Sequence, residues 1–230
     1  SNVEFRKAYK MTTWNKLIDG FHKNGISTFD DVPTEMINWI KENGEASRKN
    51  KNTYNHNLIG HMKEEYQLNN IPSYVYDYII KSAFVEPFYD TWKDMSLLTH
   101  NVPVTLSSLW INYQRKHEFN PIHDHGGFAS FIIFINIPYD IKDEERYFSG
   151  FNKDSVIHTS KLSFYNTTQH GKLDSLVVPV DKSFEGKMIM FSAKHHHEVY
   201  PFYTSDGYRI TVSGNLKFDT SLYKDFFNDK

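Results

Sequence analysis

Two short stretches of this sequence carry residue types that bind metal ions. The first, Asn120 to Gly127, contains His123 and His125, and the second ends a run of three histidines at His197. Side chains of an extended segment alternate between faces, so His123 and His125 are expected to face one way and Asp124 the other. Two imidazoles on one face can hold one metal ion, and His197 is the best candidate for a third ligand. The sequence therefore predicts a three-histidine metal site.

An arginine follows the third histidine after a turn. The turn-forming residues Ser205 to Gly207 separate His197 from Arg209, so we expect the chain to fold back and return the guanidinium toward the histidines. A guanidinium is shaped to hold a carboxylate through two N–H groups. Polar residues then occupy every second position, which indicates a strand face that could line a cavity: Arg209, Thr211, Ser213 and Asn215.

Composition describes a folded chain with few special constraints. It has 230 residues, a net charge of −2, 39% hydrophobic and 16% aromatic residues, which fit a packed domain rather than a disordered one. No cysteine is present, which excludes disulfides and thiolate ligands. The charge balance disfavours nucleic acid as a partner. No segment approaches the roughly 20 apolar residues of a membrane span, so we predict a cytoplasmic protein without membrane contact.

The first hundred residues are expected to be mainly helical. Pro33 sits near a helix start, and Pro72 opens another. Apolar residues at helical spacing mark the buried faces: Trp14, Leu17, Ile18 and Phe21; Met36, Ile37 and Ile40; Val75, Tyr78, Ile79 and Ala83. A polar loop with a short helix is expected at 44–70, and a further helix around 88–95.

From about residue 102 the pattern becomes one of short strands separated by Gly, Asp and Asn turns. The predicted strands are 102–114, 122–125, 130–137, 162–167, 173–180, 188–191, 197–202 and 208–216. The charged stretch 138–156 is expected to be a surface excursion or lid. This pattern predicts a mainly β sandwich or jelly roll with the helices on one outer face. We expect one domain over 1–230, with a helical part at 1–100, a jelly-roll core at 101–218 and a C-terminal tail at 219–230.

These motifs resemble those of the 2-oxoglutarate/Fe(II)-dependent oxygenase superfamily. The likeness is greatest to a group of oxygenases common in marine phages and bacteria. It covers roughly residues 105 to 216 and rests on Asn-Pro-x-His-x-His at 120–125, a serine-containing apolar strand at 130–137, His-x-Val-x-Pro at 197–201 and Arg-Ile-x-Val-x-x-Asn at 209–215.

The resemblance implies a double-stranded β-helix with Fe(II) in its mouth and 2-oxoglutarate as co-substrate. It implies that Arg209 binds the distal carboxylate of 2-oxoglutarate. Polar residues at offsets similar to Asn112 and Gln114 contact the co-substrate in the nucleic-acid dealkylase branch, and we add Thr211 from the polar face. An oxygenase would consume molecular oxygen, hydroxylate an unidentified small molecule or protein side chain, and release succinate and CO2. A phage-encoded protein in a bacterial host is also implied.

One position departs from the superfamily pattern, which has His-x-Asp rather than His-x-His. Either the iron has three neutral ligands, His123, His125 and His197, or Asp124 reaches it through a bulge. Two other classes of function therefore stay open. One is a cupin-like three-histidine metalloenzyme that does not use 2-oxoglutarate, such as a dioxygenase or isomerase. The other is a non-catalytic jelly-roll binding protein with a vestigial site.

Overall fold

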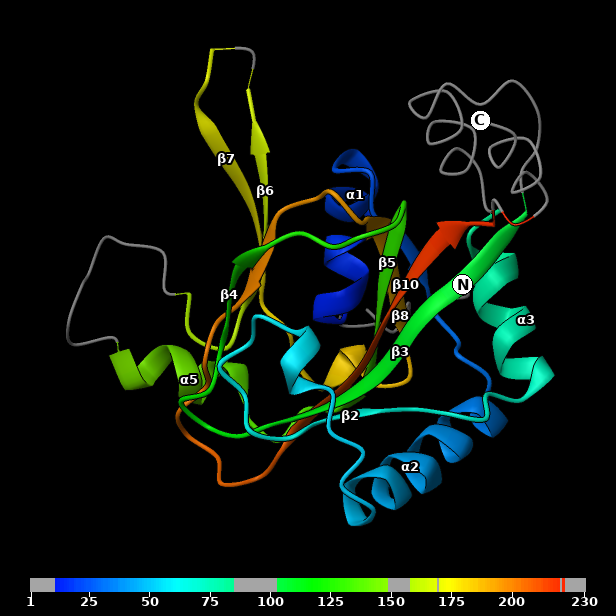
Figure 1. Cartoon of the computed structure of the whole chain (residues 1–230). Coiled ribbons are helices and arrows are strands. Elements are labelled where there is room, and N and C mark those ends of the chain that lie inside the picture. Colours follow the sequence, from blue (N-terminus) through cyan, green and yellow to red (C-terminus); the bar gives the residue numbers. More distant parts are fainter. Residues whose placement is uncertain (1–10, 85–102, 149–157, 169, 220, 222–230) are drawn as a thin grey trace, which may run out of the picture.

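The strands form two antiparallel sheets that lie face to face (Figure 1). In this computed structural model the described residues are 11–84, 103–148, 158–168, 170–219 and 221. Within them, the larger sheet has six strands in the order β1-β8-β5-β10-β3-β2, and the smaller has four in the order β4-β9-β6-β7. This arrangement is the predicted jelly roll, with helices in the N-terminal part.

The strands after residue 100 lie close to their predicted ranges. The larger sheet consists of β1 Ser27–Phe29, β8 Met188–Ser192, β5 Ala129–Asn136, β10 Arg209–Phe218, β3 Val104–Gln114 and β2 Glu65–Gln67. The smaller sheet consists of β4 Asn120–His123, β9 His197–Val199, β6 Leu162–Thr167 and β7 Leu173–Val178. Strand β9 is shorter than predicted, and β4 ends before His125. Strand β5 is buried on both faces between β8 and β10, as its apolar sequence predicted.

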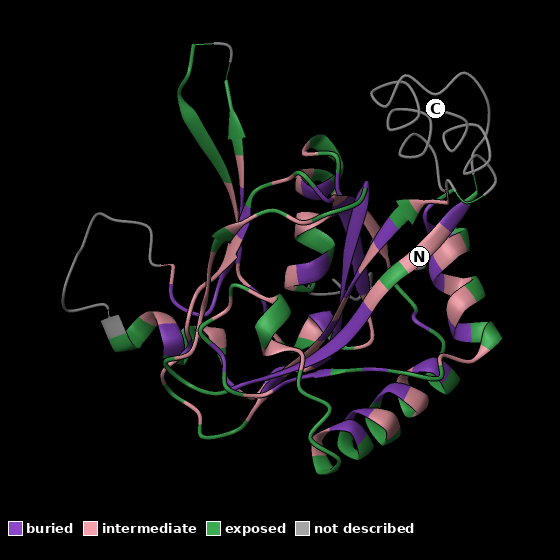
Figure 2. Ribbon diagram, in the orientation of Figure 1, coloured by how far each residue is buried: buried purple, intermediate pink, exposed green. Residues whose placement is uncertain are grey.

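The larger sheet separates two cores, and β3 contributes to both sides. On the outer side, Leu109, Ile111 and Tyr113 pack with two helices, α2 Thr34–Lys49 and α3 Ser73–Ser82. The alternate residues Trp110 and Asn112 face the space between the sheets. Purple, buried segments run along the central strands of the larger sheet (Figure 2). Period-two alternation in β3 therefore gives the sheet one helix-covered face and one face that can carry a site.

Helix α1, Thr13–Lys23, packs elsewhere. Its Trp14 and Phe21 belong to the inner core, where the Trp14 ring meets Phe184 edge-on at 5.0 Å between centroids. Phe184 ends a 3₁₀ turn, η2 Lys182–Phe184, whose Ser183 hydroxyl accepts a hydrogen bond from the Trp14 backbone N–H at 3.1 Å. The prediction of one outer face is right for α2 and α3 and wrong for α1. An apolar stripe shows which face of a helix is buried, but not against which sheet.

The N-terminal part also supplies the two edge strands of the larger sheet, β1 and β2, which the sequence did not predict. Each has three residues, too few for a period-two pattern to be recognised. The range 44–70 is accordingly more regular than expected, because α2 continues to Lys49 and β2 lies within it; the short helix is η1, Asn55–Asn57. The helix expected around 88–95 and nearly all of the tail at 219–230 lie outside the described residues.

The charged stretch after β5, expected as a surface excursion or lid, contains a helix, α5 Ile141–Phe148. Glu144 is fully buried and accepts hydrogen bonds from the backbone N–H groups of Tyr203 at 3.0 Å and Thr204 at 2.7 Å. A carboxylate that binds backbone N–H groups anchors α5 to the turn before β10. The remaining residues of the stretch, 149–156, lie outside the described part. No helix in the described ranges is long and apolar enough to cross a membrane.

Gly127 is expected to be irreplaceable at the entrance to β5. Its φ is +91°, and a Cβ there would overlap the carbonyl oxygen of Leu216. We expect Gly127→Ala to lower the free energy of unfolding by about 2–4 kcal/mol, because strain and steric overlap add. Gly126→Ala is the matched control, since its Cβ would meet nothing within 4 Å. Urea unfolding of both variants checks this, and equal losses of stability would contradict it.

Candidate active site

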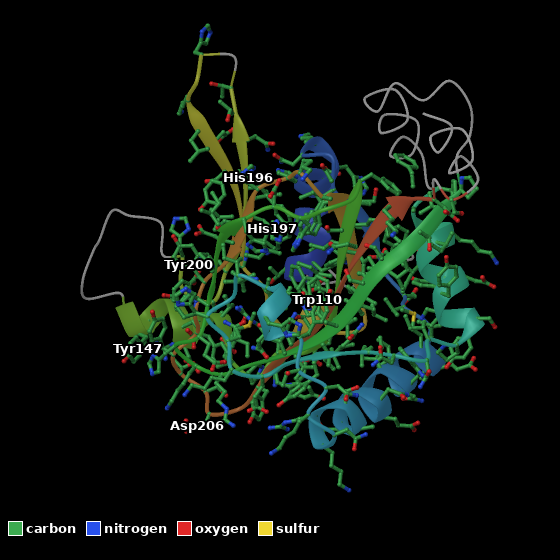
Figure 3. The ribbon with its side chains drawn as sticks, viewed as in Figure 1. Trp110, Tyr147, His196, His197, Tyr200 and Asp206 are labelled. Carbon is green, nitrogen blue, oxygen red and sulfur yellow. The ribbon has the colours of Figure 1, made fainter. Side chains whose placement is uncertain are left out.

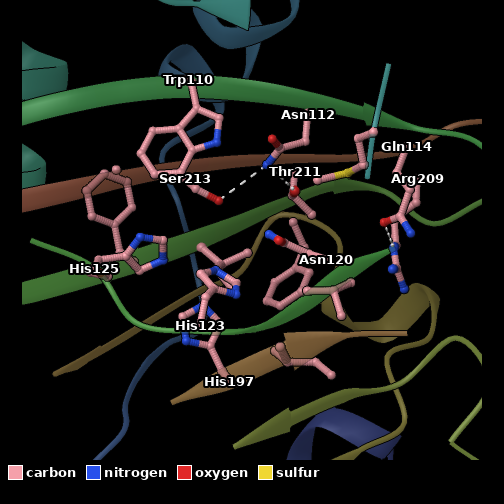
Figure 4. A pocket seen from close by; sticks show the side chains of 18 of the residues that line it. Trp110, Asn112, Gln114, Asn120, His123, His125, His197, Arg209, Thr211 and Ser213 are labelled. Atoms are coloured by element: carbon pink, nitrogen blue, oxygen red, sulfur yellow. Dashed lines mark hydrogen bonds between the residues drawn. The ribbon is translucent and has the colours of Figure 1, made fainter. Parts of the chain in front are cut away.

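Three histidines converge between the sheets (Figure 4). They are His123 on β4, His197 on the paired strand β9 and His125 in the loop that follows β4. His123 ends β4 and is the cross-strand partner of His197, the first residue of β9. Such partners project from the same face of a sheet. The His125 ring centroid lies 4.8 Å from that of His123 and 5.1 Å from that of His197. One ligand nitrogen of each ring lies within 4.8 Å of the others, which suits a single ion.

Backbone carbonyls orient two of the three rings. Nδ1 of His123 lies 2.6 Å from the carbonyl oxygen of Pro121, and Nδ1 of His197 lies 2.9 Å from that of His195. When Nδ1 donates its proton to a carbonyl, Nε2 keeps its lone pair for a metal. The tautomer needed for metal binding is therefore set by the chain itself.

Burial also keeps these imidazoles neutral. It lowers the pKa of His123, and it lowers the pKa of His125 to about 4, with a smaller contribution from neighbouring His123. The pKa of His197 lies well below its ordinary value, first because of burial and then because of the other two imidazoles. Neutral imidazole is the form that binds metal, and it suits iron as well as zinc or nickel. The donor set thus fits Fe(II).

Asp124 lies outside this cluster. Its side chain accepts a hydrogen bond from Nζ of Lys194 at 3.2 Å at the protein surface, and the same Nζ donates to the carbonyl oxygen of His125 at 2.8 Å. The β4–β9 register does shift between Asn120 and His123, but this irregularity leaves Asp124 facing outward. The alternation expected for His-x-His is present, and the bulge that would bring Asp124 to the metal is not.

Arg209 is buried at the other end of the same pocket (Figure 4). Its guanidinium donates to Oε1 of Gln114 at 2.8 Å and to the Tyr139 hydroxyl at 3.1 Å. It also donates to the backbone carbonyls of Ser160 at 2.8 Å and Tyr200 at 2.9 Å. Nη1 makes two of these bonds, while Nε and Nη2 make one each. One N–H of Nη2 is left for a ligand.

The positive charge of Arg209 is not balanced within the described chain. All four of its acceptors are neutral, and no described carboxylate forms an ion pair with it. A buried charge without a counter-ion is costly, so a ligand carboxylate would be stabilised here. The sequence suggested a two-pronged clamp, but with a single N–H left a carboxylate would need a second donor from another residue.

The other residues assigned to the co-substrate line the pocket between Arg209 and the histidines. Asn112 faces Thr211 across the β3–β10 ladder, and its Nδ2 donates to the Thr211 hydroxyl at 3.2 Å and to that of Ser213 at 3.4 Å. Oδ1 of Asn112 is buried without a partner. Gln114 is the register partner of Arg209 and holds its Nε. The structure thus brings all the predicted residues to one pocket.

Two further residues of the pocket were not assigned from the sequence. Trp110, labelled in Figure 3, lies on the same face of β3 as Asn112 (Figure 4), and its ring centroid is 6.0 Å from that of His125. Asn120, the first residue of β4, lies near the middle of the pocket (Figure 4). The alternation with Asn112 could have revealed Trp110. Asn120 stands in the quoted motif, but nothing in its spacing indicates a role.

A jelly roll that holds neutral histidines and an unbalanced arginine in one internal pocket has the architecture of a metal-dependent enzyme. Residues 108–215 match a family model described as "Putative 2OG-Fe(II) oxygenase", so this segment is similar to the 2OG-Fe(II) oxygenases. The matched segment contains the three histidines and Arg209. The predicted enzyme class and its cofactors, Fe(II) and 2-oxoglutarate, are confirmed. A phage origin and a cytoplasmic location stay predictions. No curated protein sequence matches the chain.

Solved structures resemble this chain at low sequence identity. A prolyl-4-hydroxylase from Pseudomonas putida superposes with a TM-score of 0.51 at 10% identity, covering 88% of this chain and 97% of that one. HygX from Streptomyces hygroscopicus, solved with nickel and 2-oxoglutarate bound, gives a TM-score of 0.49 at 9% identity, covering 91% and 88%. At such identities the first likeness shows the jelly-roll fold and does not transfer a substrate.

Proposed function

We propose that this chain hydroxylates an organic substrate, either a small molecule or a protein side chain, with release of succinate and CO2. The whole chain would act as one oxygenase domain, because β1 and β2 complete the larger sheet. The proposed iron ligands are His123, His125 and His197. The proposed co-substrate residues are Arg209, Asn112, Gln114 and Thr211.

The observation that carries this proposal is the shared pocket of the histidine cluster and the unbalanced guanidinium. None of the residues that line the pocket is acidic. A divalent ion on the three histidines together with Arg209 would place three positive charges in it. 2-Oxoglutarate brings two negative charges and reduces this to one. A neutral co-substrate would leave all three uncompensated, so the charge balance favours a dicarboxylate.

The pocket offers several hydrogen-bond donors to 2-oxoglutarate. At the distal carboxylate, the remaining N–H of Arg209 can be joined by the hydroxyl of Thr211, which lines the same pocket. A half-turn of the Asn112 amide would let its Oδ1 accept from the hydroxyl of Ser213, and would turn Nδ2 into the pocket. This orientation satisfies the otherwise unpartnered Oδ1 and supplies one more donor to an anion.

The pocket walls keep water away from the reaction. They are apolar around the polar residues and include Ile132, Phe134, Leu162, Val180 and Val199. Bound Fe(II) and 2-oxoglutarate supply the oxidation itself, in which the co-substrate becomes succinate and CO2 while O2 provides the oxygen atom of the new hydroxyl. The residues of the chain bind, orient and dehydrate these partners.

A groove next to the histidines provides the approach for the substrate. It is lined by 57–59 on one side and by Ile122 and the loop that follows on the other, with Trp110, His123 and His125 at its base. Ile59 and Ile122 are 56% and 48% exposed on its walls. A groove that reaches the metal ligands from solvent can present a C–H bond to the metal while the co-substrate occupies the inner pocket.

An anaerobic titration tests the proposal. The metal-free protein receives Fe(II) and then 2-oxoglutarate, and the visible charge-transfer band of chelated co-substrate is expected to appear. Iron binding without a band would favour the cupin-like three-histidine enzyme instead. Failure to bind iron would favour the non-catalytic jelly-roll binding protein.

A further inference from the structure

A buried carboxyl group, that of Glu65, points toward the pocket and has none of the roles given above. Glu65 is the register partner of Asn112 at the edge of the larger sheet. Cross-strand partners project from the same face, and Asn112 lines the pocket, so Glu65 faces the same interior. It is 0% exposed. Its Oε2 accepts a hydrogen bond from Nδ2 of Asn55 at 3.1 Å, whereas Oε1 is buried and has no donor.

A second unpartnered acceptor lies next to this one. Oδ1 of Asn120 is also buried without a hydrogen bond. Both oxygens lie beside Gly60, because a Cβ on this residue would lie 3.2 Å from Oε1 of Glu65 and 3.4 Å from Oδ1 of Asn120. Both oxygens therefore border the space left by the missing side chain of Gly60. Two buried acceptors without a donor between them are an unstable arrangement, so something must donate.

Either Glu65 or the Asn120 amide can supply this donor. The two cases differ in which side of the Asn120 amide, its N–H or its oxygen, faces the pocket. If Glu65 is protonated, its O–H donates to Oδ1 of Asn120, and Nδ2 of Asn120 is turned into the pocket. If Glu65 is ionised, the amide must make a half-turn to donate Nδ2 to the carboxylate, and Oδ1 then faces the pocket. The anion 2-oxoglutarate has only acceptors at its carboxylates, so it is complementary to the first arrangement.

The surroundings of Glu65 favour the protonated form. Burial, and then the negative charge of Glu118, raise the pKa of Glu65 to about 7, against the opposing hydrogen bond from Asn55. Glu118 lies in the loop between β3 and β4, where the backbone N–H groups of Lys63 and Arg115 donate to its carboxylate at 3.3 and 2.9 Å. Asn112, opposite Glu65 on β3, and Asn120 of β4, beside the same space at Gly60, carry uncharged amides.

We propose that Glu65 is a positioning residue that, when protonated, donates a hydrogen bond to Oδ1 of Asn120 and so turns the amide N–H of Asn120 toward 2-oxoglutarate. This inference rests on the proposed function, because it needs the co-substrate in the pocket. Asn120 lies between His123 and Arg209 in Figure 4, beside the path of a ligand that joins the metal to the guanidinium. Ionisation of Glu65 then weakens co-substrate binding.

Calorimetric titration of 2-oxoglutarate into the full chain loaded with Ni(II) tests this, since nickel allows binding without turnover. Between pH 6.5 and 8.5 the co-substrate stays doubly ionised. The parent is expected to bind about 20-fold more weakly at pH 8.5 than at pH 6.5, because only the protonated fraction is competent. The binding heat should also depend on the buffer, which reports proton uptake. Glu65→Gln can donate from Nε2 at any pH, so its Kd should stay constant within about twofold.

Two controls separate the possible outcomes. Glu45→Gln removes one negative charge from an exposed site, and its Kd for 2-oxoglutarate should depend on pH as that of the parent does. Asn120→Ala should bind 2-oxoglutarate weakly, with a Kd that does not depend on pH. Adding Glu65→Gln to this variant should leave that Kd unchanged. The inference is overturned if the Kd of the parent does not depend on pH, or if the Kd of Glu65→Gln depends on pH as that of the parent does. Should Glu65→Gln fail to fold, absence of proton uptake by the parent at pH 8 overturns it as well. No binding of 2-oxoglutarate at any pH would instead overturn the proposed function.

Discussion

Replacing His197 by alanine is expected to abolish specific metal binding, and with it all turnover of 2-oxoglutarate. His197 is the most buried of the three histidines and lies against both of the others. Outer partners of a metal ligand are typically worth 10–100-fold in affinity, so loss of the ligand itself should cost more than about 100-fold. The remaining pair, His123 and His125, would hold an ion only loosely.

Metal-linked stability measures this without reference to activity. At a metal concentration of 100 times Kd, the parent should gain about 2.7 kcal/mol in unfolding free energy, whereas His197→Ala should gain almost nothing. His170→Ala removes an exposed histidine from the turn between β6 and β7 and should behave like the parent. Because His197→Ala also opens a cavity, His123→Ala serves as a second ligand variant. Full metal stabilisation in either folded ligand variant would contradict the three-histidine site.

Period-two alternation explains why so much of this site is visible in the sequence. His123 and His125 flank an outward Asp124, and Asn112 and Gln114 share one face of β3. The same rule applied to β3 would have placed Trp110 on the pocket wall. These features depend only on a local backbone conformation, which the residue types themselves favour.

The features that the sequence did not reveal depend on contacts between distant segments. Three of the four acceptors around Arg209 come from Tyr139, Ser160 and Tyr200, which lie in three separate connections and share no spacing with it. Their arrangement is why the expected two-pronged clamp has only one N–H to offer. Glu65 likewise faces the pocket side of the sheet only because the three-residue strand β2 pairs with β3. Long-range register of this kind has no local sequence signal.

Replacing Arg209 by methionine is expected to weaken 2-oxoglutarate binding by about two to three and a half orders of magnitude while leaving metal binding intact. Loss of one partner of a buried ion pair typically costs about 3–5 kcal/mol, and each 1.4 kcal/mol is a factor of ten in Kd. In the ligand-free protein the effects oppose each other. The variant loses the four hydrogen bonds of the guanidinium, but it also loses an uncompensated buried charge. Its stability should therefore fall less than its affinity for the co-substrate.

Arg209→Lys separates charge from shape. Lysine keeps the positive charge but cannot make the four bonds of the guanidinium at once, so we expect its affinity for 2-oxoglutarate to lie between those of the parent and Arg209→Met. Arg146→Met is the matched control, because it makes the same change at an exposed arginine of α5. Titration of the Fe(II)-loaded proteins with 2-oxoglutarate gives all four affinities. Parent-like affinity in a folded Arg209→Met protein would show that the co-substrate carboxylate binds elsewhere. The order parent, lysine, methionine would show that the buried charge, rather than the shape of the pocket, selects a dicarboxylate.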